Sequence, residues 1–160
     1  MWVKTINGIN RFTEWMTGIF LVIMVIIIFV QIVSRILIQS SFPWTEELAR
    51  YLMIWLTFLG ASFSFQYGAH IGVEILTSKV PKKVAAFFQV IAALFCIFLF
   101  VLLVVKGYEL VGKSTMQTSP ALSIPMNYVY MIIPISGILM ILNVIDVTIK
   151  NLLGIKKEET

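Results

Sequence analysis

The chain has 160 residues, of which 59% are hydrophobic and only 12% are charged, and its formal net charge is +4. Its mean hydropathy of +0.96 lies far outside the range of a soluble domain and is typical of a protein that crosses a membrane several times. The basic residues flank apolar stretches and form no nucleic-acid motif. We therefore expect them to orient the chain in a membrane, and we expect no nucleic-acid partner.

The first apolar stretch, Ile19–Ile38, is interrupted only by Gln31, Ser34 and Arg35. About 20 apolar residues cross a bilayer as a helix, and we place this span at about 14–38. No barrel-type alternation is present, and a helix satisfies its own backbone groups in lipid. No small-x-small cleavage pattern follows, so we expect the stretch to remain as a membrane anchor.

The second stretch, Leu48–Phe65, contains one charge, Arg50, near its start. We place this span at about 46–67. Thr45 has the chemistry of an N-cap, which predicts that the helix begins at Glu46.

Small residues recur every four positions along the second span, at Gly60, Ser64 and Gly68. Such a face lets another helix approach closely in a membrane. The neighbour is either a helix of the same bundle or one of a partner protein, and the sequence leaves both open.

The third stretch, Val84–Val105, has no charge, and we place its span at about 84–106. Beyond it, Glu109 and Lys113 stand four residues apart, which predicts that the helix continues toward the next loop. These charged residues, together with Trp44 from the loop between the first two spans, form an expected rim at the outer side of the membrane, which would be the periplasmic rim in a bacterial inner membrane: Lys106, Glu109 and Lys113.

The fourth stretch, Met126–Ile145, is also uncharged, and we place its span at about 125–149. Pro134 and Gly137 interrupt it, and we interpret them as a structural kink. The prediction is therefore an all-α integral membrane protein with four transmembrane helices in a single membrane domain, 1–160.

Eight of the twelve basic residues fall on one side of this four-span arrangement. Because basic residues are enriched in cytoplasmic segments, both termini are predicted to be cytoplasmic. The eight are Lys4, Arg11, Lys79, Lys82, Lys83, Lys150, Lys156 and Lys157.

Enzyme chemistry finds little support in this sequence. It has one histidine, one cysteine, no paired carboxylate inside a span and no phosphate-binding GxxxxGK[ST] loop. A haem-carrying electron-transfer subunit would need axial ligands on facing helices, usually histidines. We expect no enzyme, no cofactor, and no substrate or metal site in this chain. The lack of an ionisable residue deep in a span also argues against a self-sufficient carrier.

Four charged residues meet where the first predicted hairpin turns: Arg35, Glu46, Glu47 and Arg50. Arg50 follows Glu46 by four residues and Glu47 by three, so the three share a helical face. The two acids and two bases allow a network without net charge, which makes charges tolerable in a low-dielectric setting. We expect this cluster to hold protein surfaces together, not to bind a substrate.

Several segments in order resemble the DctQ-type small membrane subunit of the tripartite ATP-independent periplasmic (TRAP) transporters. They are Arg35, Pro43–Arg50, Trp55, Gly60-Ala61-Ser62, Ala69–Glu74 with Pro81, Ser119–Leu122, Ile124-Pro125 and Tyr128. The resemblance runs along essentially the whole chain, and the size and the four predicted spans fit it.

The resemblance implies a non-catalytic small permease subunit in the bacterial inner membrane. Its implied partners are a large membrane subunit, which holds the substrate and the coupling sodium, a periplasmic binding protein and membrane lipids. The transported organic acid would be of the sialic-acid or C4-dicarboxylate type. An alternative is a self-contained small exporter that works as a homodimer.

Overall fold

The computed structural model describes residues 2–37, 39, 42–67 and 82–153. Residues 68–81, which include Gly68 and lie between the second and third predicted spans, are therefore outside the described residues. The helices are α1 (Trp2–Leu37), α2 (Pro43–Ser64), α4 (Lys82–Lys113), α5 (Met126–Tyr130) and α6 (Ile132–Leu153). The described part of the chain forms no β-strand beyond an isolated bridge between Thr118 and Pro125. The all-helical prediction is confirmed.

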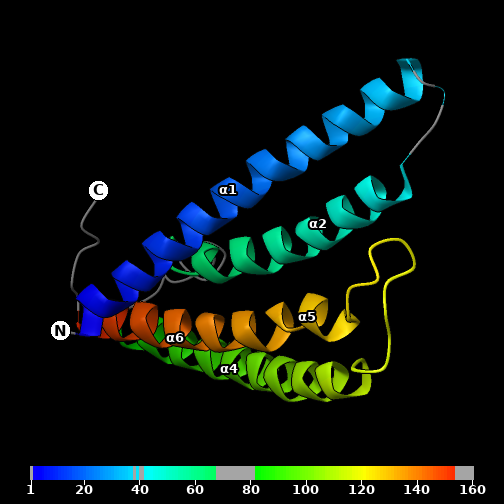
Figure 1. Cartoon of the computed structure of the whole chain (residues 1–160). Coiled ribbons are helices and arrows are strands. Elements are labelled where there is room, and N and C mark those ends of the chain that lie inside the picture. The colour runs from blue at the N-terminus through cyan, green and yellow to red at the C-terminus, as the bar shows by residue number, and fades with distance from the viewer. Residues whose placement is uncertain (1, 38, 40–41, 68–81, 154–160) are drawn as a thin grey trace.

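The helices form two antiparallel hairpins (Figure 1). α1 packs along α2, and α4 packs along α6, while α2 lies against α6 and joins the two hairpins. The start of α1 and the end of α6 lie at one end of the bundle, which we call the terminal end. The opposite end, with the end of α1, the start of α2 and residues 114–125, is the loop end. Toward the loop end, α1 diverges from α6, and α2 is the one described helix that remains beside it (Figure 1).

Three helical segments of the described chain are long and apolar enough to cross a membrane: Thr5–Leu37, Val84–Lys113 and Met126–Lys150. α2 is not among them, because its first turns carry Glu46, Glu47 and Arg50 and its second half contains small and hydroxyl residues. A fourth span in α2 therefore stays a prediction.

The start of α2 differs from the prediction. The helix begins at Pro43 and not at Glu46, and its capping residue is Phe42. Proline suits the first position of a helix, because its fixed φ is already helical and no intrahelical N–H bond is lost there. Thr45 lies inside the first turn, fully buried, and its hydroxyl donates a hydrogen bond to the carbonyl of Phe42 at 2.7 Å.

The fourth predicted span is broken at Met131, which separates α5 from α6. The cause is Pro134, which has no N–H to donate to the carbonyl of Tyr130 and whose ring crowds that carbonyl. The chain therefore restarts its helix at Ile132, with Pro134 in the first turn. The predicted interruption exists, but it stands three residues before Pro134.

Gly137, predicted as part of the kink, instead lies at a close approach of α4 and α6. A Cβ at Gly137 would come within 2.7 Å of Val104 Cγ2, and a Cβ at Gly107 would come within 3.1 Å of the backbone nitrogen of Pro134. These two glycines let the helices pack backbone to backbone. Below them, the buried core of Ala93, Phe100, Met140 and Val144 joins the same two helices.

Candidate functional site

The most elaborate cluster of charged and polar contacts lies at the loop end, around Glu47. Its side chain is 9% exposed, although it stands in the second turn of a helix. The Tyr51 hydroxyl donates a hydrogen bond to Glu47 Oε1, and the backbone N–H groups of Ala121 and Leu122 donate to Oε2 at 2.9 and 3.0 Å. One carboxylate therefore fastens the loop between α4 and α5 to the start of α2.

The loop is shaped to present those two N–H groups. Ser119 donates its N–H to the carbonyl of Ile124 and accepts the N–H of Ile124 on its hydroxyl. Ser123 has a positive φ of 53°, which turns the chain back toward Pro125. Two successive backbone N–H groups pointing the same way form an anion-binding concavity, and here the anion is a side chain of the same protein.

The surroundings of Glu47 favour its charged form. The hydrogen bonds from Tyr51, Ala121 and Leu122 all stabilise the ionised carboxylate, because each donor points at one of its oxygens. Its place near the start of α2 also suits the helix dipole.

Glu46, the neighbouring acid, has a different environment. It is exposed and accepts a hydrogen bond from Arg50 at 2.8 Å, with both side chains more than 60% exposed. Arg35 is exposed near the end of α1, and no ion pair joins it to another described residue. The predicted network of four charges is therefore reduced to one ion pair, while Glu47 turns inward. Trp44 is 43% exposed and packs against Phe42.

The predicted helical extension beyond the third span is present, because α4 continues to Lys113. Glu109 accepts hydrogen bonds from Lys106 at 2.8 Å and from Lys113 at 2.7 Å. All three side chains are largely exposed, so they form a charged ridge at the loop end. Solvent-exposed pairs of this kind contribute little to stability.

The small residues Gly60 and Ser64 of α2 do not pack against another described helix of this chain. A Cβ at Gly60 would meet no atom within 4 Å. Ser64 is exposed, and its hydroxyl bonds back to the carbonyl of Gly60 at 2.7 Å. Of the two possibilities left open by the sequence, contact within the bundle does not apply to these two residues.

The sequence analysis missed a buried amide cluster nearer the terminal end. Asn10 and Asn143 exchange hydrogen bonds of 2.6 and 3.0 Å across α1 and α6, and both are almost fully buried. Asn143 also donates to the carbonyl of Ser62 at 2.7 Å, and Asn10 donates to Gln66 at 2.6 Å. Three helices are thus joined by side-chain amides. The sequence does contain one signal for this amide cluster, because Asn143 is an amide inside an otherwise apolar stretch.

A second feature missed from the sequence is a buried carboxylate. Asp146 is 1% exposed on α6, one turn before Lys150, whose Nζ lies 2.6 Å from Asp146 Oδ2. The pair lies toward the terminal end of α6 and not at its middle. Asp146 thus lies seven residues before the end of α6, about 10 Å along the helix axis, and Glu47 lies four residues after the start of α2.

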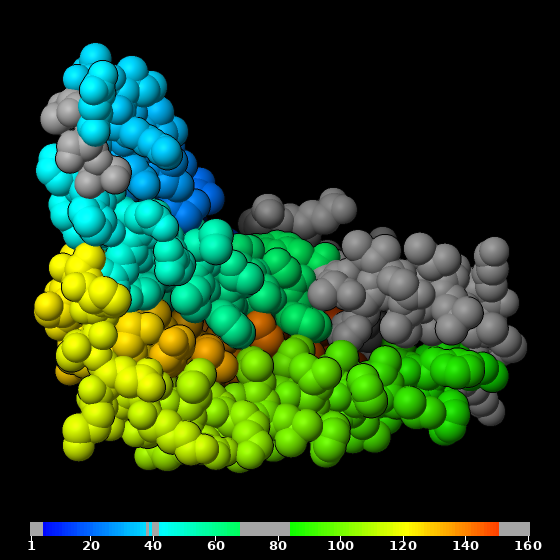
Figure 2. Space-filling view, turned by 90° about the vertical axis from the view of Figure 1, so that its right-hand side faces the viewer, coloured from blue at the N-terminus to red at the C-terminus, as the bar shows by residue number. Residues whose placement is uncertain are grey.

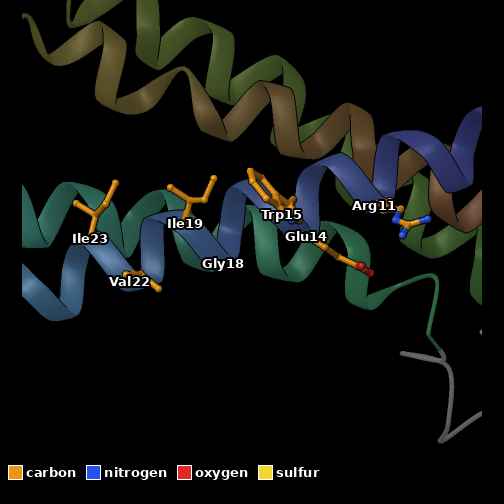
Figure 3. A pocket seen from close by; sticks show the side chains of 7 residues that line it. All are labelled: Arg11, Glu14, Trp15, Gly18, Ile19, Val22 and Ile23. Carbon is orange, nitrogen blue, oxygen red and sulfur yellow. The ribbon is translucent and has the colours of Figure 1, made fainter.

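A shallow hollow of about 600 Å³ lies on α1. Figure 3 shows it over Gly18, between Trp15 and Val22, with Arg11 and Glu14 toward the terminal end. The described residues that line it all belong to one face of one helix. Its apolar floor and charged end match the surface of a helix in a lipid layer, and it holds no arrangement of a nucleophile beside a base.

The comparisons with known proteins identify the family to which this sequence is similar. The family model of the tripartite ATP-independent periplasmic transporters, DctQ component, matches residues 24–154. A TRAP transporter small permease protein of Haemophilus influenzae is 30% identical over 135 residues, which is 82% of this chain and 81% of the relative. The C4-dicarboxylate TRAP transporter small permease protein DctQ of Vibrio cholerae is 25% identical over 107 residues, 64% of this chain and 46% of the relative.

A third relative has a different length. The sialic acid TRAP transporter permease protein SiaT of Haemophilus influenzae is 33% identical over 96 residues, which is 58% of this chain but only 16% of SiaT. The chain thus spans a small part of one relative and most of another. The matched family, together with three membrane-crossing helical segments, makes this a multi-pass protein of the bacterial inner membrane. The chain belongs to the DctQ family of small TRAP transporter permease subunits.

Proposed function

We propose that this chain is a non-catalytic scaffold that pairs with a larger TRAP permease subunit. In this proposal the larger subunit holds the transported organic acid and the coupling sodium. The observation that carries the proposal is that the charged side chains near the loop end are already bound to other groups of this chain. The carboxylate of Glu47 is occupied by Tyr51 and by the chain's own loop. The other charged residues pair with one another on the surface: Glu46, Arg50, Lys106, Glu109 and Lys113.

The proposal includes four spans with both termini in the cytoplasm, so that the loop end faces the periplasm. α2 has 22 residues, which at 1.5 Å per residue gives about 33 Å, close to the thickness of a hydrocarbon core. The basic residues Arg11 and Lys150 lie toward the terminal end, in agreement with a cytoplasmic position.

At the periplasmic face, the loop fastened by Glu47 and the ridge of Lys106, Glu109 and Lys113 would help to dock a soluble binding protein. Trp44 would belong to the same rim. The pinned loop supports this idea, because a surface held in one conformation costs less ordering entropy on binding. Lipids would cover the apolar outer surfaces.

The substrate is proposed only as an organic acid. One relative is named for sialic acid and another for a C4-dicarboxylate, so the family admits more than one acid. Since this chain would not contact the acid, its residues would not determine which acid is transported.

The experiment that tests the proposal is uptake in proteoliposomes. Vesicles with this chain alone should show no sodium-dependent uptake of sialic acid or a C4-dicarboxylate. Adding the larger subunit and the loaded binding protein should restore uptake of one acid. Transport by this chain alone would overturn the proposal and favour the alternative of a small homodimeric exporter.

A further inference from the structure

One face of α2 is open along most of the helix. Its residues follow the spacing i, i+4, i+7, i+11, i+14 and i+18, which is a single stripe on a helix. They are Glu46, Arg50, Met53, Thr57, Gly60 and Ser64. All except Gly60 are exposed, and Gly60 has open space where a side chain would stand. We call these six residues the α2 face, and Figure 2 shows α2 uncovered above α4 on this side of the molecule.

The chemistry of the α2 face differs from that of the exposed middle parts of α1 and α4. From Leu21 to Ile32 on α1, and from Val84 to Val105 on α4, every exposed side chain is aliphatic or a phenyl ring. Such surfaces suit lipid. On the α2 face only Met53 is apolar with a large side chain, so a lipid chain would meet charges, hydroxyls and a glycine.

The ion pair on this face lies well inside the helix. Arg50 is seven residues beyond Pro43, or about 10 Å along the helix axis. Its side chain and that of Glu46 are 62% and 66% exposed. Charged groups facing hydrocarbon at such a depth are costly, and in membrane proteins they usually face other protein segments. The ion pair therefore points to a protein neighbour with polar groups of its own.

Farther along the α2 face, the side chains are small, and the hydroxyl groups already donate hydrogen bonds to backbone carbonyls. Thr57 donates to the carbonyl of Met53 at 2.8 Å, and Ser64 donates to that of Gly60 at 2.7 Å. No polar group is left there that would need water or a small ligand. A glycine and a serine one turn apart instead allow another helix to approach to backbone contact.

We propose that the α2 face is covered by a transmembrane helix of the larger permease subunit, and that the exposed faces of α1 and α4 contact lipid. This inference rests on the proposed function and adds the location of the contact. In SiaT the matched region makes up 16% of one polypeptide. One copy of this region is therefore joined there to one much larger remainder of the protein. That ratio favours a helix of a different chain over a second copy of this one.

The first test uses two open glycines, each with no atom within 4 Å of an added Cβ. Gly60→Leu places a large side chain on the α2 face, and Gly18→Leu places the same side chain on the apolar surface of α1. With the tagged larger subunit coexpressed, Gly60→Leu should lower copurification by about tenfold or more, because the side chain wedges the helices apart. Gly18→Leu should copurify like the wild type. Thermal unfolding of each variant alone should match the wild type.

The second test is photo-cross-linking in native membranes. A photoreactive residue at Thr57 should form an adduct with the larger subunit, and one at Val25 on α1 should not. An adduct between two copies of this chain at Thr57, or an equal effect of the two leucine substitutions, would overturn the inference. If the wild-type chain fails to copurify with the larger subunit, the proposed function itself is wrong. If it copurifies and Gly60→Leu does too, only the location is wrong.

Discussion

At the scale of single residues, two adjacent carboxylates have different roles. Glu46 points outward and pairs with Arg50, while Glu47 turns inward and accepts the N–H groups of Ala121 and Leu122. Helical geometry places consecutive residues about 100° apart, so the two cannot share an environment. Removing a buried acceptor leaves its donors unpaired, whereas an exposed acceptor is readily replaced by water.

Glu47→Gln should therefore loosen the loop that Glu47 holds. The glutamine amide keeps the size of the side chain, and its carbonyl oxygen can still accept the N–H groups of Ala121 and Leu122, but it is uncharged and its NH2 group cannot accept the hydrogen bond of the Tyr51 hydroxyl. Amide hydrogen exchange at Ala121 and Leu122 should become roughly tenfold faster, because their N–H groups then bond to a neutral acceptor and the charge assistance is lost. The matched control is Glu46→Gln, which should leave exchange in the loop unchanged. Equal effects of the two substitutions would contradict this division of roles.

At the scale of helices, the contact between α4 and α6 depends on glycines that the sequence analysis did not connect. Gly107 faces the ring and backbone nitrogen of Pro134, which are rigid neighbours. Gly112 lies on the same helix with open space around it. The two positions therefore separate the effect of packing from that of helix propensity.

Gly107→Ala should destabilise the protein, because the added methyl group overlaps atoms that have little freedom to move. Overpacking of this kind costs about 1–3 kcal/mol. Gly112→Ala gains the same helix propensity without a clash and should be neutral or slightly stabilising. Thermal unfolding in detergent of the two variants checks this, and a lower midpoint for Gly112→Ala than for Gly107→Ala would contradict it.

The amide cluster acts between helices in the same way. Asn143→Ala removes the partner of Asn10 and the donor to the Ser62 carbonyl, in a buried environment. Unpaired buried polar groups cost about 1–3 kcal/mol in general, and pairs inside membranes average about 0.6 kcal/mol. We expect a loss of stability within this range, measured by unfolding in detergent. The control Asn127→Ala removes only a local hydrogen bond to Tyr128 and should have a smaller effect.

At the scale of the whole molecule, the two hairpins are fastened near both ends. The amide cluster joins α1, α2 and α6 nearer the terminal end, and Glu47 joins α2 to the loop before α5 at the loop end. The far half of α1 is left with α2 alone as a neighbour (Figure 1). This leaves a large apolar surface that a membrane would cover.

The orientation of this assembly is testable with single cysteines. After Cys96→Ser, Met116→Cys should react with a membrane-impermeant maleimide added to the periplasmic side, since Met116 is 95% exposed at the loop end. Thr160→Cys should react only after the membrane is made permeable. The reverse pattern would contradict cytoplasmic termini.

The sequence alone determined the helical membrane class, three of the spans and the continuation of α4 to Lys113. These follow from local quantities, namely long apolar stretches and helical spacing, and lipid admits few backbone solutions for such stretches. The order of short motifs was enough to indicate the family, which the family model then confirmed.

Only the tertiary structure decided which of Glu46 and Glu47 is buried, that Gly137 packs against α4, and that Asn10 meets Asn143. Each depends on a segment far away in the sequence: Glu47 and Ala121 are 74 positions apart, and Asn10 and Asn143 are 133 positions apart. Hydropathy and periodicity describe one helix at a time. They carry no information about which neighbour a side chain meets, and that choice is made by the packing of all the helices together.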